Sequence, residues 1–147
     1  MLRKITASLV ATAALALPSL AGDCTSSLDV AVDGDIQSGA TVSVDVSGSL
    51  PMAITFLAVG ETPGETSFAL GPLGDLTIGL DFPFAVLPVG QTDLAGDLSV
   101  SFETPGAPVE IEPLSLHAQA ITLGLDFGGF PPELSLCTSN LTSFSIQ

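Results

Sequence analysis

Apolar and polar residues alternate with a period of two along much of the chain. The clearest run, ATVSVDV at residues 40–46, places an apolar residue at every second position, and Leu28–Val32 and Leu98–Phe102 show the same pattern. Alternation of this kind, with β-branched residues on the apolar side, is typical of strands that are buried on one face. These three segments are therefore expected to be strands.

The longest series of expected strands lies in the middle of the chain. Four short apolar runs follow one another there, at Ala53–Val59, Ser67–Leu70, Leu76–Leu80 and Phe84–Val89. Glycines and prolines separate the runs, and no 3.6-residue periodicity is present. Three more strands are expected later, at Leu116–Leu123, Leu134–Cys137 and Leu141–Ile146. Nine or ten short strands without a helix predict an all-β fold, namely an immunoglobulin-like or jelly-roll antiparallel β-sandwich, with a closed barrel as the alternative.

The first 21 residues have the features of a secretory signal peptide. Arg3 and Lys4 form its charged start, residues 5–17 are mainly apolar, and Ser19-Leu20-Ala21 is a small-x-small cleavage site. A membrane anchor is the alternative, but the apolar run is too short to span about 30 Å of hydrocarbon comfortably. We therefore expect an exported protein, secreted or at the cell surface, with a single domain over residues 22–147.

The charge of the chain limits its partners. Arg3 and Lys4 are its only Lys or Arg residues, whereas all 16 acidic residues follow the signal peptide. No basic side chain of Lys or Arg type remains after cleavage to neutralise a phosphate. Nucleic acid and anionic membranes are therefore excluded as natural partners.

The two cysteines are expected to form a disulfide, because disulfides persist in exported proteins. Cys24 opens the mature domain and Cys137 lies near its end. The bond would close a loop that includes most of the domain. Two free thiols are the alternative.

Several short motifs carry a resemblance to a known group of domains. They are FLAVG from Phe56, GPLG from Gly71, VLPV from Val86, the TDxxGD turn from Thr92, LSVSF from Leu98 and LHAQAITL from Leu116. Their order resembles secreted β-sandwich domains of extracellular proteins from environmental bacteria such as planctomycetes. The resemblance covers Ala53 to about Leu123 and implies the fold and export, but no activity. One departure is the late strand, where Leu116 and His117 replace an aromatic residue.

Candidate sites for chemistry are few. His117 is the only histidine, and no G-x-S-x-G nucleophile motif is present, so no catalytic residue is predicted. Paired carboxylates could serve a glycosidase. However, tryptophan and tyrosine, on which sugars usually stack, are both absent, and the eight phenylalanines are expected in the core. Two aspartate pairs in expected turns, Asp33 with Asp35 and Asp93 with Asp97, are candidate ligands for calcium, a cation that prefers oxygen.

Two classes of function remain open. The first is a non-enzymatic structural or adhesion domain that acts through self-association or through contact with envelope or matrix components. The second is an extracellular ligand-binding module for carbohydrate or calcium. The composition favours the first class, because a carbohydrate-binding sandwich usually exposes an aromatic platform. No cofactor is expected, apart from the calcium that the second class could bind.

Overall fold

The computed structural model describes Cys24, residues 26–106, Glu110 and residues 112–147. The expected signal peptide at residues 1–21 lies outside these residues. The described part is an antiparallel all-β sandwich, so the predicted fold class is confirmed. None of its helical turns has the length or the apolar character needed to cross a membrane. In chain order the elements are β1 (Ser27–Asp35), β2 (Gly39–Ser47), β3 (Ile54–Gly60), β4 (Pro63–Ala69), the 3₁₀ turn η1 (Gly71–Leu73), β5 (Asp75–Leu80), β6 (Phe84–Gln91), β7 (Leu98–Glu103), β8 (Leu114–Asp126), β9 (Glu133–Thr138) and β10 (Thr142–Ile146).

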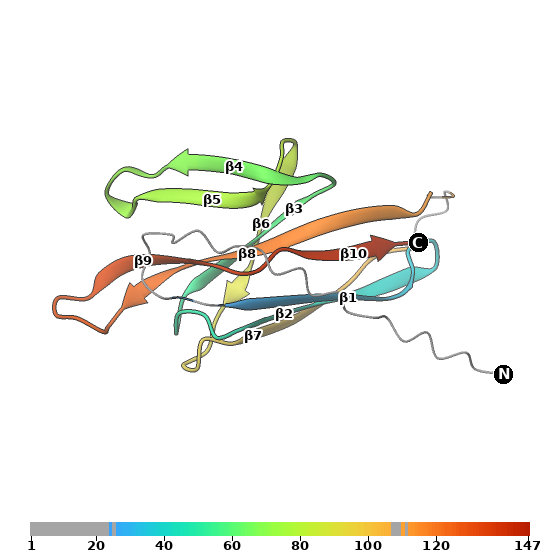
Figure 1. The fold of residues 1–147 in the computed structure, drawn as a ribbon. Helices are drawn as coiled ribbons and strands as arrows, with labels where there is room; N and C mark the ends of the chain where they lie inside the picture. The colour runs from blue at the N-terminus through green and yellow to red at the C-terminus, as the bar shows by residue number, and fades with distance from the viewer. Residues whose placement is uncertain (1–23, 25, 107–109, 111) are drawn as a thin grey trace.

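The strands stack in three layers (Figure 1). The first sheet has the order β1-β2-β7, the middle sheet has the order β10-β8-β3-β6, and the β4–β5 hairpin forms a separate third layer. In the middle sheet, β10 pairs with the first part of β8 and β9 with the last part, so one 13-residue strand carries both in succession. The third layer was not expected from the sequence.

The central parts of β3 and β8 are buried on both faces, which explains why apolar residues occupy successive positions at 56–59 in β3 and at 120–121 in β8. Leu57 of β3 and Ala120 of β8 belong to the core shared with the first sheet. Their neighbours Ala58 and Ile121 pack on the opposite side, in a second core with Ile78 of β5. The β4–β5 hairpin is therefore docked on the middle sheet by apolar contacts.

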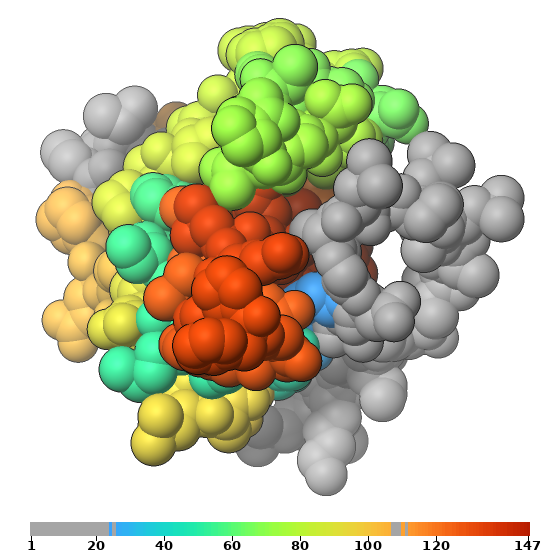
Figure 2. All heavy atoms as spheres, turned by 90° about the vertical axis from the view of Figure 1, so that its left-hand side faces the viewer, coloured from blue at the N-terminus to red at the C-terminus, as the bar shows by residue number. Residues whose placement is uncertain are grey.

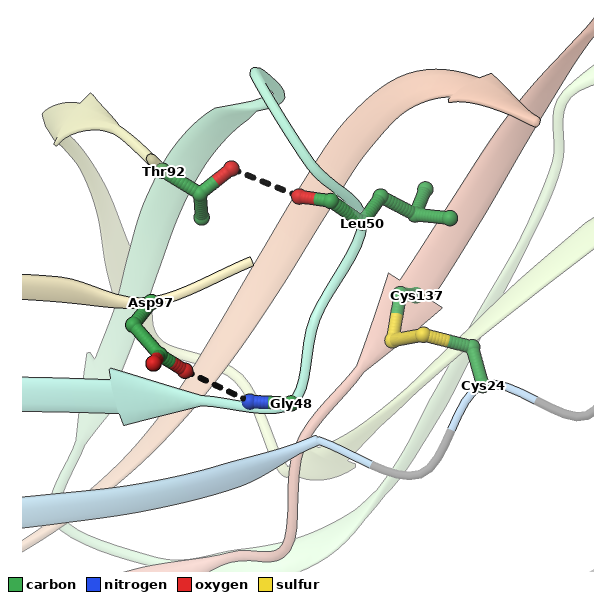
Figure 3. The surroundings of a disulfide bond; sticks show 6 residues. All are labelled: Cys24, Gly48, Leu50, Thr92, Asp97 and Cys137. Atoms are coloured by element: carbon green, nitrogen blue, oxygen red, sulfur yellow. Dashed lines mark hydrogen bonds between the residues drawn. A yellow bond between two sulfur atoms is a disulfide. The ribbon is translucent and has the colours of Figure 1, made fainter. Parts of the chain in front are cut away.

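The predicted disulfide between Cys24 and Cys137 is confirmed (Figure 3). The two Cα atoms lie 5.5 Å apart, and Cys137 is buried in β9. The bond joins the segment before β1 to the middle sheet across a sequence separation of 113 residues. Such a bond indicates an oxidising environment.

One local expectation is wrong, and one expected strand is longer than its expected bounds. Asp33-Gly34-Asp35 is not a turn but the last part of β1, because the antiparallel register with β2 continues until Asp35 faces Gly39. The chain turns only afterwards, at residues 36–38. The strand expected at Leu116–Leu123 extends from Leu114 to Asp126, because β9 and β10 supply partners for its two ends.

Only half of the eight phenylalanines pack against the core, namely Phe56, Phe68, Phe84 and Phe144, so the expectation that all eight lie there is corrected. The buried apolar residues of the described part are alanine, valine, leucine, isoleucine and cysteine, and no phenylalanine is among them. Four of the eight phenylalanines are exposed, namely Phe82, Phe102, Phe127 and Phe130. Aromatic rings are therefore available on the surface, although the chain has no tryptophan or tyrosine.

Candidate functional site

The loop Thr92–Asp97 fastens the connection between β2 and β3. The buried Thr92 hydroxyl donates a 2.6 Å hydrogen bond to the carbonyl of Leu50 and accepts a 2.8 Å bond from the N–H of Ala53. Asp97 Oδ1 accepts a 3.0 Å hydrogen bond from the N–H of Gly48, close to the disulfide (Figure 3). The two connections thus hold each other in place.

Asp93 shapes this loop from within. Its Oδ1 accepts hydrogen bonds from the backbone N–H groups of Asp97, at 2.9 Å, and Ala95, at 2.8 Å. These bonds favour the charged carboxylate and lower the pKa of Asp93 below its ordinary value of 3.8. Gly96 has a φ of +85°, and a Cβ there would collide with the carbonyl oxygen of Ser49, so the turn requires glycine. The TDxxGD motif has a structural role in the fold.

The two aspartate pairs predicted to bind calcium lie at different ends of the first sheet. Asp33 and Asp35 lie where β1 meets Gly39, whereas Asp97 lies beside Gly48, after the other end of β2. Nine-residue strands separate these ends by about 27 Å, at about 3.4 Å per residue. In the described ranges, no group of three or more His, Cys, Asp or Glu side chains is arranged to hold a metal ion. Calcium binding at either pair stays a prediction.

His117 lies half-buried in β8, between Gly60 of β3 and Ser143 of β10. No side-chain hydrogen bond joins Ser143 to the imidazole in the described part of the chain, and no carboxylate there bonds to the ring. A serine nucleophile needs a base within hydrogen-bond reach, and that base needs a group to orient it. The geometry therefore provides no support for a catalytic role of this pair.

A cleft of about 300 Å³ lies between the β4–β5 hairpin and the middle sheet. Nine side chains from six strands line this apolar cleft, and all nine are hydrocarbon: Phe56, Phe68, Leu76, Ile78, Phe84, Val86, Ile121, Leu123 and Leu136. In β8, Ile121 and Leu123 face the cleft because residues two apart share a face of a strand, whereas Ala120 faces the first sheet.

Gln119 connects the hairpin to the middle sheet. Its side chain is only 8% exposed. Its Oε1 accepts a 2.8 Å hydrogen bond from the N–H of Gly79 in β5, and its Nε2 donates a 2.8 Å bond to the carbonyl of Ser139. Within the described residues β5 pairs only with β4, so this amide supplies the acceptor that a second neighbouring strand would otherwise provide.

Three aromatic rings enclose one end of the apolar cleft. Phe82 stacks on Phe84 with ring centroids 4.7 Å apart, and Phe68 meets these two rings edge-on at 6.1 and 6.3 Å. Phe68 and Phe84 line the cleft itself, whereas Phe82 is 66% exposed. Edge-to-face and offset-stacked pairs are favourable, so this end of the cleft is well supported.

Beyond the cleft, the apolar side chains of β8 and β9 continue onto the hairpin that joins these two strands. Leu125 and Leu134 face each other across this hairpin and extend the line of Leu123 and Leu136, but both are exposed. Phe127 and Phe130 follow in the connecting turn, 66% and 100% exposed. We refer to Leu125, Phe127, Phe130 and Leu134 as the apolar tip. The hairpin projects past the first sheet in Figure 1, and Figure 2 views it end-on in orange and red, below the green β4–β5 hairpin.

Two acidic residues flank the apolar tip. Asp126 and Glu133 are register partners, and together with Phe130 they line a shallow hollow of about 230 Å³. Asp126 Oδ1 accepts a 2.8 Å hydrogen bond from the N–H of Gly128. Like charges directly opposite each other in a sheet are unfavourable. A positively charged group of a partner would relieve this repulsion.

No protein-family model, curated protein or solved structure matches the chain. The resemblance to secreted domains of environmental bacteria is therefore still a prediction.

The apolar cleft and the apolar tip were not predicted from the sequence. The signal for both is the continued alternation of leucine through Leu125 on one side of the Gly128-Gly129 turn and from Leu134 on the other.

Proposed function

We propose that the chain is exported and works as a non-enzymatic structural or adhesion domain, which makes its contacts through the apolar tip. The observation that carries this proposal is the exposure of Phe127 and Phe130 on a projecting hairpin, 66% and 100% respectively. Large apolar side chains gathered on a protein surface mark interaction sites. The disulfide supports export, because such bonds persist outside the cytosol.

The partner that fits the apolar tip is an apolar surface that also carries positive charge. Asp126 and Glu133 flank the tip, and residues 22–147 contain no Lys or Arg. A second copy of the chain would bring two strongly negative bodies together, which is unfavourable at low salt. Basic components of an envelope or matrix satisfy both requirements, and we propose them as the partner.

Surface plasmon resonance on mixed monolayers tests the proposal. Binding to a surface of alkyl and amine groups should exceed binding to one of alkyl and carboxylate groups by about tenfold at low salt. The double variant Phe127→Ser/Phe130→Ser should lose most of the binding to the alkyl–amine surface. The matched control, Leu94→Ser/Phe102→Ser, changes two residues that are 83% and 44% exposed elsewhere and should bind like the wild type.

Two results would count against the proposal. Equal binding by the tip variant and the wild type would mean that charge alone attracts the protein. A dimer seen by sedimentation at 1 M salt, and lost in the tip variant, would show that the tip pairs with a second copy instead of a basic partner.

A carbohydrate-binding module is the second candidate, and one observation favours it. Phe130 and Phe127 present aromatic faces to solvent, which the sequence led us not to expect. An aromatic ring with carboxylates beside it is an arrangement that can stack a sugar and bond to its hydroxyls. A glycan array would distinguish the two functions, since specific binding that disappears in Phe130→Ser would favour carbohydrate over adhesion.

A further inference from the structure

The apolar cleft is open to solvent at its rim, where Val86 is 47% exposed. It measures about 300 Å³ between the β4–β5 hairpin and the middle sheet. Water in a cleft lined by Leu, Ile, Val and Phe side chains finds no hydrogen-bond partner on its walls, so its displacement by an apolar molecule is favourable. At about 30 Å³ per water-sized group, the cleft has room for roughly ten methylene-sized groups.

We propose that the apolar cleft binds a single hydrocarbon chain of about eight carbons whose head group carries no negative charge. The lining is hydrocarbon throughout, including Leu123, Leu136 and Val86, so the chain of the ligand is recognised and its head group stays in solvent. The 16 acidic residues with no Lys or Arg in residues 22–147 repel a carboxylate or phosphate head.

Other occupants fit the cleft less well. A peptide strand or a sugar would lose hydrogen bonds to water on entry and would need polar partners in return. The nine lining side chains offer none. The N–H of Gly79, on β5 next to Ile78, is already bonded to Gln119. A hydrocarbon chain requires no such partner, and each buried CH₂ contributes about 0.8 kcal/mol.

This inference does not depend on the proposed function. The apolar tip is defined by Leu125, Phe127, Phe130 and Leu134, none of which lines the cleft. Loss of hydrocarbon binding would leave contact through the tip intact, and the converse also holds. The two proposals can therefore fail separately.

Methyl NMR of the disulfide-bonded domain with 1-octanol provides the test. We expect saturable shifts at the methyl groups of Ile121, Leu123 and Leu136, and little change at Leu94, which is 83% exposed in the loop after β6. Octanoate should bind about tenfold more weakly than octanol at 10 mM salt, and the difference should shrink at 1 M salt because the charges are screened. Octyltrimethylammonium should bind at least as well as octanol.

A pair of matched variants locates the binding. Leu136→Phe places a larger side chain in the cleft and should weaken octanol binding by tenfold or more, whereas Leu94→Phe, the same change in the loop, should not. If Leu136→Phe fails to fold, Val86→Phe at the 47% exposed rim replaces it. The variant Phe127→Ser/Phe130→Ser should bind octanol normally. Shifts that do not saturate, or octanol binding that is unchanged in a folded cleft variant, would overturn the proposal.

Discussion

The side chain of Gln119 is predicted to hold the third layer on the sandwich, so Gln119→Ala should weaken the fold. In the wild type, its amide accepts from the N–H of Gly79 and donates to the carbonyl of Ser139, both at 2.8 Å. Alanine would leave both backbone groups without a partner in a largely buried place. An unsatisfied buried polar group costs about 1–3 kcal/mol.

The expected loss follows from these two groups. Some of the cost is recovered, because the buried amide of Gln119 no longer has to be removed from water and a water molecule can enter the space it leaves. We therefore expect Gln119→Ala to lower the free energy of unfolding by about 2–4 kcal/mol. For a domain of this size, the melting temperature should fall by on the order of 10 °C.

Urea unfolding followed by circular dichroism measures the change. Gln37→Ala is the matched control, because Gln37 is exposed and its side chain has no hydrogen bond to another layer among the residues that the structure describes. This variant should change the free energy of unfolding by less than about 0.5 kcal/mol. Amide hydrogen exchange gives a local readout, in which the Gly79 amide should exchange faster in Gln119→Ala while the Leu57 amide changes little. A loss below about 0.5 kcal/mol with unchanged exchange at Gly79 would refute the role of Gln119.

Four further predictions concern stability. Reduction of the Cys24–Cys137 bond should lower the free energy of unfolding by about 4–5 kcal/mol; alkylation of both cysteines in denaturant without reductant would refute the bond. Thr55 and Thr122 face each other in β3 and β8, and neither buried hydroxyl has a hydrogen-bond partner within the described residues. Thr122→Val should therefore stabilise the fold by about 1 kcal/mol. The same change at the exposed Thr77 should not stabilise it. Asp93→Ala should destabilise the fold at pH 7. Because the folded pKa of Asp93 is lowered, its carboxylate stabilises the fold above the unfolded pKa near 3.8, and this stabilisation is lost as pH falls through the folded pKa. The melting curves of variant and wild type should therefore converge in acid. Raising NaCl from 0.1 to 1 M should raise the melting temperature, because salt screens the repulsion among the carboxylates, and no response to NaCl would contradict that repulsion. At equal ionic strength, a higher melting temperature in Ca²⁺ than in Mg²⁺ that is lost in Asp93→Ala or Asp33→Ala would indicate a calcium site.

The sequence predicted the strands well where glycine and proline separate them. The four runs expected between Ala53 and Val89 correspond to β3 to β6. Their distribution over layers was not predicted, because alternation shows that a strand has a buried face but not which sheet covers it. A hairpin inserted between two partner strands looks the same in the sequence whether it joins their sheet or folds over it.

The candidate sites show a second limit. The Thr92–Asp97 turn is predicted correctly. Its carboxylates are candidate calcium ligands by their spacing, and in the structure they accept hydrogen bonds from backbone N–H groups. Aspartate favours turns for that reason, and sequence spacing does not separate the two uses. The exposed Phe127 and Phe130 were missed because apolar residue type indicates burial only on average.

Fractionation of the cells that make the protein tests the central claim most directly. Wild type and the Phe127→Ser/Phe130→Ser variant are expressed at equal levels and assayed in cytoplasm, envelope and medium at low salt. We expect the wild type outside the cytoplasm and bound to the envelope or matrix, and the tip variant released into the medium. Wild-type protein in the cytoplasm, or equal retention of both proteins on the envelope, would contradict an exported domain that makes its contacts through the apolar tip.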